Sequence, residues 1–130
     1  MSNLSHPDQE LVEAARAIIK LRYKEGWHHV GAALRTRSGK IFSAVHLEAY
    51  IGRIAVCAEA VALGMAAAAG DTEIDTIVAV NKDGMIVSPC GMCREMISDY
   101  SPDAVVIIMR AGHVSVVPIS ELLPDKYHRS

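Results

Sequence analysis

The chain holds three cysteines, and two short stretches contain all of them. Cys57 opens CAEA at 57–60, and Cys90 and Cys93 lie in PCGMC at 89–93. Both stretches have the pattern of a helix start, where free backbone N–H groups and positive potential favour thiolate over thiol. Cys90 and Cys93 are three residues apart, as in the C-x-x-C half of many zinc sites. If the two helix starts meet, three thiolates leave the fourth tetrahedral zinc position open, as in catalytic sites.

Other uses of the three thiols remain open at this level. A C-x-x-C pair also suits a thiol–disulfide oxidoreductase, which would use Cys90 and Cys93 and leave Cys57 idle. A closed structural zinc site would suit a non-catalytic, zinc-stabilised binding protein. Glu59 bears on this choice, because a carboxylate in an apolar helix is costly without a partner. Its side chain points to a different side of the helix from Cys57, where it can take a proton from a metal-bound water.

The elements that must position these residues follow helix and strand patterns in turn. Helices are expected over 7–25, from about Ile54 or Cys57 to Ala69, and near Cys90 to Tyr100, with strands at 29–34, 40–46, 76–80, 104–109 and 114–117. The second helix is apolar almost all round, which predicts burial on several sides. The order α-β-β-α-β-α-β-β predicts one mixed sheet with helices on both faces, in a single domain over residues 1–130.

Composition and charge exclude several classes of function. The 130 residues are 51% hydrophobic and 22% charged, which predicts a globular chain with one core. A net charge of −2, with one Trp, four Tyr and one Phe, argues against nucleic-acid binding. The longest apolar run, 54–70, is short for a transmembrane helix and contains Glu59, so no membrane partner is expected. The N-terminus lacks a signal-peptide pattern, and three cysteines suit a reducing cytoplasm.

C-A-E at 57–59 and P-C-x-x-C at 89–93 together resemble the zinc signature of the cytidine deaminase family, in its three-cysteine form. The resemblance extends over most of the chain. VGAAL at 30–34 looks like the family's first strand, GDTE at 70–73 like the turn after its catalytic helix, and ELLP at 121–124 like its C-terminal motif. The implied fold is a three-layer α/β/α sandwich around a five-stranded mixed sheet.

The resemblance implies a zinc-dependent hydrolytic deaminase with one Zn²⁺ per chain. Zinc held by Cys57, Cys90 and Cys93 would activate a water that attacks the amine-bearing carbon of a cytosine-type base. Glu59 would be the catalytic residue that carries the proton from this water to the ring nitrogen and then to the departing ammonia. The implied partners are a small-molecule nucleoside and further copies of the chain in a homo-oligomer, a tetramer or alternatively a dimer.

Charge balance and base recognition follow from the same resemblance. Three thiolates leave the zinc site net negative, and the family often offsets this with an arginine directly after C-A-E. Here Ala60 stands at that position. Arg94, with Arg53 second, is therefore the charge expected to hydrogen-bond a thiolate. The backbone around Ala58 and Ser88 is expected to hydrogen-bond the edge of the base.

The residues expected to bind the rest of the substrate depart from the family pattern. The ribose-binding N-x-E of the family corresponds to residues 46–48, where Glu48 keeps the carboxylate and His46 replaces the amide. The aromatic residue that stacks on the base corresponds to His28, and the C-terminal phenylalanine corresponds to Tyr127. A strand-end His46 without a ligand role and a surface position for His28 are the alternatives.

Two features of the sequence point to different substrates within the family. The alanine-rich stretch LGMAAAAG resembles the blasticidin S deaminases, which act on a modified cytosine nucleoside. The eleven-residue interval from His46 to Cys57 follows the cytidine enzymes better. The sequence therefore predicts deamination of a cytosine-type nucleoside or analogue, with a blasticidin S-type or other non-cytidine substrate as the alternative.

Overall fold

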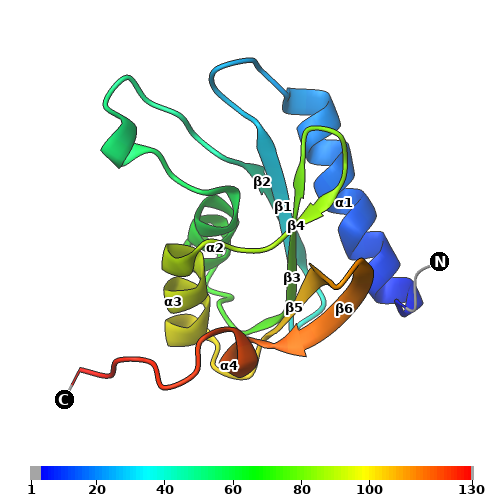
Figure 1. Cartoon of the computed structure of the whole chain (residues 1–130), viewed down its shortest axis with the longest axis vertical. Helices are drawn as coiled ribbons and strands as arrows, with labels where there is room; N and C mark the ends of the chain where they lie inside the picture. Colours follow the sequence, from blue (N-terminus) through cyan, green and yellow to red (C-terminus); the bar gives the residue numbers. More distant parts are fainter. Residues whose placement is uncertain (1–3, 130) are drawn as a thin grey trace.

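A six-stranded mixed sheet forms the middle layer of the protein, in a computed structural model that describes residues 4–129. Helix α1 covers one face of the sheet, and α2 and α3 cover the other (Figure 1). The elements are α1 His6–Arg22, β1 Val30–Thr36, β2 Ile41–Val45, the 3-10 helix η1 Gly52–Ile54, α2 Ala58–Ala68, β3 Ile74–Asn81, β4 Ile86–Val87, α3 Gly91–Tyr100, β5 Val105–Arg110, β6 His113–Pro118 and α4 Ile119–Leu122. The predicted three-layer α/β/α sandwich is confirmed.

The strand order is β2-β1-β3-β5-β6, and only the β3–β5 pair is parallel. β3 shares one edge between two partners. Its first half pairs with β5 at Thr76 and Ile77, and its second half pairs with β4 at Ala79 and Val80. The chain leaves β4 directly into the start of α3, so this split edge carries the second cysteine motif to the end of the sheet that α2 also approaches.

Alternate residues of the central strands face opposite layers, as the period of two in a β-strand requires. Both faces pack against apolar side chains, and the cluster toward α2 and α3 contains more residues than the cluster toward α1. The α1 side contains Leu11, Val12, Ala15, Ile19, Ala33, Val78, Val80 and Ile107. The other side contains, among others, Leu34, Leu63, Ala66, Ile77, Ile97, Val106 and Ile108. Separate cores therefore hold the two helical layers on one sheet, and a third, small cluster of Ala32, Ala58 and Ala79 lies at the start of α2.

The structure corrects several predicted boundaries. α1 ends at Arg22 rather than at residue 25, because the chain turns back in a Lys24–His28 bridge before β1 begins. The sheet has a sixth strand, β4, which the prediction of five strands missed because two residues show no periodicity. One side of α2, including Met65, remains exposed, so its expected burial on several sides is not met within one chain. Within residues 4–129, no helix is long and apolar enough to span a membrane.

Candidate active site and metal centre

The three cysteines lie at the N-terminal ends of two helices that meet. Cys57 is the N-cap of α2 and Cys90 the N-cap of α3, both with extended backbone (φ −64°, ψ 149° and φ −69°, ψ 170°). Neither side chain caps its own helix, so both sulfurs are free to face another partner. Cys93 follows in the first turn of α3. The first-turn N–H groups and the helix dipoles stabilise negative charge at this meeting point.

The sulfur positions fit a single tetrahedral metal ion. Sγ of Cys57 lies 3.5 Å from Sγ of Cys90, and all three sulfurs lie within 4.8 Å of one another. A zinc–sulfur bond of about 2.3 Å requires tetrahedral sulfurs to lie about 3.8 Å apart, so the cluster needs only small adjustments. Cys93 is buried and Cys90 is exposed, which leaves the open side of the cluster toward solvent.

Without a metal, the three thiols do not ionise together. Burial raises the pKa of Cys93 far above its usual value and also raises that of Cys57. Burial opposes ionisation of Cys90 as well, but hydrogen bonds from the backbone N–H of Cys93 and from Cys57 outweigh it and lower its pKa. A divalent cation is therefore what converts the whole cluster to thiolates, since its charge offsets both the burial and the mutual repulsion.

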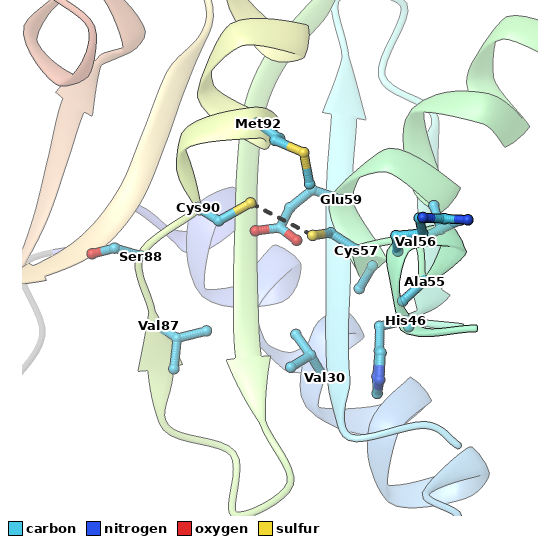
Figure 2. Close-up of a pocket in the computed structure, with 13 residues that line it drawn as sticks. Val30, His46, Ala55, Val56, Cys57, Glu59, Val87, Ser88, Cys90 and Met92 are labelled. Carbon is cyan, nitrogen blue, oxygen red and sulfur yellow. Dashed lines mark hydrogen bonds between the residues drawn. The ribbon is translucent and has the colours of Figure 1, made fainter. Parts of the chain in front are cut away.

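Glu59 places a carboxyl group beside the cysteines. It lies in the first turn of α2, its side chain is buried (7% exposed), and it points toward the sulfurs of Cys57 and Cys90 (Figure 2). Burial raises the pKa of Glu59, and a hydrogen bond from its own backbone N–H and one from Cys93 only partly counter this. A carboxyl group with a raised pKa beside a metal site is a candidate for taking up and releasing a proton.

A pocket of about 370 Å³ opens in front of this cluster. Cys57, Cys90 and Glu59 form part of its wall, and Val30 and Val87 stand across from them in Figure 2. The volume lies within the usual range for small-molecule sites, which is roughly 300–1,000 Å³. The mainly apolar wall suits a flat ring, and the titratable groups gather where chemistry on that ring would occur. The complete lining is Val30, His46, Gly52, Arg53, Ala55, Val56, Cys57, Ala58, Glu59, Val87, Ser88, Cys90 and Met92.

His46 lines the pocket in one fixed tautomer. The backbone N–H of His29 donates to Nδ1 of His46 at 2.7 Å, so the ring proton is on Nε2. Burial and the neighbouring His29 lower the pKa of His46, which keeps the ring neutral. Nε2 lies 3.8 Å from Oε2 of Glu48, and Nδ1 of His28 donates to the carbonyl oxygen of His46 at 2.8 Å. Glu48 and His28 are thus neighbours of His46, and neither lines the pocket.

The sequence of this chain is similar to that of known deaminases. Residues 5–109 match the family described as the cytidine and deoxycytidylate deaminase zinc-binding region. This chain belongs to that deaminase family. It is 52% identical over 136 residues to the blasticidin-S deaminase of Bacillus cereus, covering 98% of this chain and 97% of the other. It is 29% identical over 100 residues to the cytidine deaminase of Halalkalibacterium halodurans, covering 75% and 76%.

The solved structures agree with the fold. The cytidine deaminase of Burkholderia pseudomallei superposes with a TM-score of 0.80 and 32% identity, covering 95% of this chain and all of that one. As a member of this deaminase family, the chain is a zinc-dependent hydrolase, and Cys57, Cys90 and Cys93 form the cluster suited to its one metal ion. The predictions of the family, the enzyme class and the zinc cofactor are confirmed.

Of the remaining predicted site residues, two line the pocket and two do not. Ala58 and Ser88 line the pocket next to the cysteines. Tyr127 is 80% exposed and lies at a different hollow, over α3. The guanidinium of Arg94 donates from Nε to the carbonyl of Pro89 at 2.9 Å and from Nη1 to that of Leu122 at 3.1 Å, so it ties the loop before α3 to α4.

Sequence reasoning missed seven residues of the pocket wall, including Gly52, Ala55 and Val56 in the segment before Cys57. Val30, Val87 and Met92 contribute apolar surface, and Arg53 contributes a charge, although it had been considered only as a thiolate partner. Met92 lies between the two cysteines of the C-x-x-C motif, so its position in the sequence could have shown it. Nothing in the sequence identified Val87, because it lies in the two-residue strand β4.

Proposed function

We propose that this enzyme removes the amine from a cytosine-type nucleoside, and that a modified nucleoside such as blasticidin S is its preferred substrate. The observation that carries the proposal is a buried carboxyl group, Glu59, beside a three-thiol metal site on the wall of a nucleoside-sized pocket. The choice of substrate is supported by 52% identity to a blasticidin-S deaminase over nearly the whole of both chains. We treat residues 1–130 as one catalytic domain.

In this proposal Glu59 moves the proton. Zinc, when bound by the three cysteines, supplies the Lewis acid that makes water nucleophilic at neutral pH. Glu59 takes a proton from the attacking water and gives it to the ring nitrogen beside the amine-bearing carbon. It then takes the remaining proton from the new hydroxyl group on that carbon and gives it to the amine as the amine leaves. The C–N bond breaks, a carbonyl forms, and ammonia departs. The raised pKa of Glu59 suits both halves of this transfer.

The pocket residues bind and orient the base. We propose that backbone groups at Ala58 and Ser88 hydrogen-bond its polar edge, because both residues line the pocket next to the cysteines. Val30 and Val87 offer an apolar surface to the ring, and His46 forms the neighbouring wall. Glu48 and His28 then contribute indirectly, by fixing the position of His46.

Arg94 is proposed to position a metal ligand. It holds the carbonyl of Pro89, the residue directly before Cys90, and the carbonyl of Leu122 in α4. This contact fixes the loop that sets the direction of the Cys90 sulfur. Arg94 therefore acts on the metal centre through the backbone in this proposal, and not through a bond to a thiolate.

The test is ammonia release by zinc-loaded protein with blasticidin S, cytidine, deoxycytidine and cytosine. Blasticidin S is expected to have the highest kcat/KM. Glu59→Gln keeps the size and hydrogen-bonding capacity of the side chain but cannot carry a proton. We expect it to retain zinc and thermal stability and to lower kcat by about 10²- to 10⁴-fold. Zinc content is measured on the same samples.

The two parts of the proposal fail separately. Normal turnover by Glu59→Gln would contradict the proton-transfer role. Faster turnover of cytidine than of blasticidin S would keep the chemistry and overturn the choice of substrate. A zinc-loaded protein that releases ammonia from none of the four compounds would be a binding protein and not a deaminase of cytosine nucleosides.

We also propose that the enzyme assembles into a homo-oligomer, in the first instance a tetramer, in a reducing cytoplasm. The assembly is supported by the exposed apolar side of α2, which includes Met65, and the compartment by the three free thiols. Tyr127 lies away from the pocket of its own chain, so any contact with substrate would be made in a neighbouring copy.

A further inference from the structure

A short closed loop forms part of the rim of the pocket. Residues 47–56 begin and end at one point, because Leu47 and Val56 exchange two backbone hydrogen bonds of 2.9 Å. Between them, η1 is closed by bonds of 3.0 Å from the N–H of Ile54 to the carbonyl of Ile51 and from that of Ala55 to that of Gly52. The loop therefore presents its side chains from a defined backbone, which continues directly into Cys57.

This loop carries a positive charge into the pocket wall. Of the residues described, 4–129, Arg53 is the only lysine or arginine that lines the pocket. Within the same range its guanidinium takes part in no ion pair and no hydrogen bond. Residues 51–54 are exposed, so Arg53 belongs to the rim, whereas Glu59 is buried.

The acidic residue of the loop is occupied elsewhere. Oε1 of Glu48 accepts a hydrogen bond from the backbone N–H of Ala49 at 3.1 Å, and Oε2 faces Nε2 of His46 at 3.8 Å. The fixed tautomer of His46 puts its ring proton on Nε2, the atom that faces Glu48. Arg53 has five N–H donors, lies beside the cavity and has no acceptor among residues 4–129.

The substrate must place its sugar near this rim. In a cytosine nucleoside, the amine-bearing carbon and the sugar-bearing nitrogen lie on opposite sides of the six-membered ring. A base with its amine at Glu59 and the cysteines therefore directs its sugar away from them and toward the mouth of the pocket. A guanidinium is the side chain best suited to bind carboxylate or phosphate oxygens, because its planar fork matches their geometry.

We propose that Arg53 is a specificity-determining residue that binds an anionic group, a carboxylate or a phosphate, on the sugar of the substrate. The inference rests on the proposed function and adds to it a class of substrate: cytosine nucleosides with a negatively charged sugar. It also assigns the selectivity to a residue outside the family's zinc signature. Because the rim is exposed, the contribution of Arg53 weakens as salt screens the charge.

Binding of the uracil products tests the inference without any need for turnover. Uridine, uridine 5′-monophosphate and uridine 5′-carboxylate are titrated calorimetrically into the zinc-loaded protein at low and high salt. We expect at least one of the anionic ligands to bind about tenfold or more tightly than uridine at low salt. Arg53→Gln is expected to reduce this ratio to near one. Arg22→Gln removes the same charge from the end of α1, a helix on the opposite face of the sheet, and is expected to retain the ratio.

Each outcome decides the matter. A phosphate-only advantage identifies a nucleotide, and a carboxylate-only advantage identifies a sugar acid; both support the proposal if they depend on Arg53. Equal affinities in the unchanged protein, an unchanged ratio in Arg53→Gln, or no binding of any of the three ligands would overturn it. Ammonia release is measured separately, so a failure of the proposed deamination is distinguishable from a failure of this inference.

Discussion

Each of the three cysteines has a distinct environment, yet a metal needs all three as thiolates. Cys93 is buried, Cys57 is half-buried and Cys90 is exposed. Cys57 is the only ligand contributed by α2, so zinc joins the start of this helix to the start of α3. The ion is therefore expected to stabilise the packing of two elements as well as to serve the reaction.

Cys57→Ser is expected to lower bound zinc from one ion to well below one per chain, and to lower Tm by roughly 10 °C. The reason is that one of three ligands is lost and the link between α2 and α3 is lost with it. Zinc is measured by elemental analysis and Tm by calorimetry. A strong chelator should produce the same Tm decrease in the unchanged protein and almost none in Cys57→Ser. Full zinc content in Cys57→Ser would contradict the three-cysteine site.

At the scale of elements, the contact of α1 with β1 is unusually close. Gly31 lies in β1 directly under the helix, and a Cβ built on it would lie 2.6 Å from the carbonyl oxygen of Ala15 and 2.8 Å from Cβ of Ile19. A backbone oxygen cannot move aside as a side-chain end can. The sequence therefore needs glycine here so that α1 can cover the sheet, and β1 in turn carries Val30 to the pocket.

Gly31→Ala is expected to decrease the free energy of unfolding by about 2–3 kcal/mol, because the added methyl group forces α1 away from β1. Urea denaturation followed by circular dichroism measures the change. Gly52→Ala is the matched control, since a Cβ there would meet nothing within 4 Å, and it should stay within about 0.5 kcal/mol of the unchanged protein. Equal midpoints for the two variants would show that α1 does not pack as described.

At the scale of the whole molecule, one helix surface has no partner among residues 4–129. Gly64, Met65, Ala67 and Ala68 are exposed on α2, although the helix is apolar throughout most of its length. Small residues allow close helix–helix approach, and an exposed apolar surface beside a site marks an interaction region. This surface is our candidate for the contact between copies, and it lies on the same helix as Glu59.

Met65→Glu is expected to reduce the mass in solution from about four times 14.0 kDa toward that of smaller species, because a charge would be buried at the contact without a partner. Light scattering coupled to size-exclusion chromatography measures the mass. Leu21→Glu is the control, since Leu21 is 67% exposed on α1, on the other face of the sheet. A solution mass of 14.0 kDa for the protein without substitutions, which is that of one chain, would rule out this contact. A tetramer that persists in Met65→Glu would rule it out as well.

The sequence alone determined the features that depend on local order along the chain. The helix starts at Cys57 and Cys90, the three-residue interval to Cys93 and the apolar central strands follow from spacing and residue type. They were enough to predict the family, the zinc cofactor and the layered fold. The prediction of Glu59 as the catalytic residue rests on the same motif and awaits its variant.

Only the tertiary structure decided the features that depend on contacts between distant segments. The tautomer of His46 is set by the backbone of His29, seventeen residues away in the chain. Nε2 of His46, which carries the ring proton, faces Oε2 of Glu48 at 3.8 Å, and Arg53 has no ion-pair partner among residues 4–129. Which atom of a side chain forms a hydrogen bond or an ion pair depends on which groups meet in space. Sequence spacing does not encode this when the groups lie in different elements.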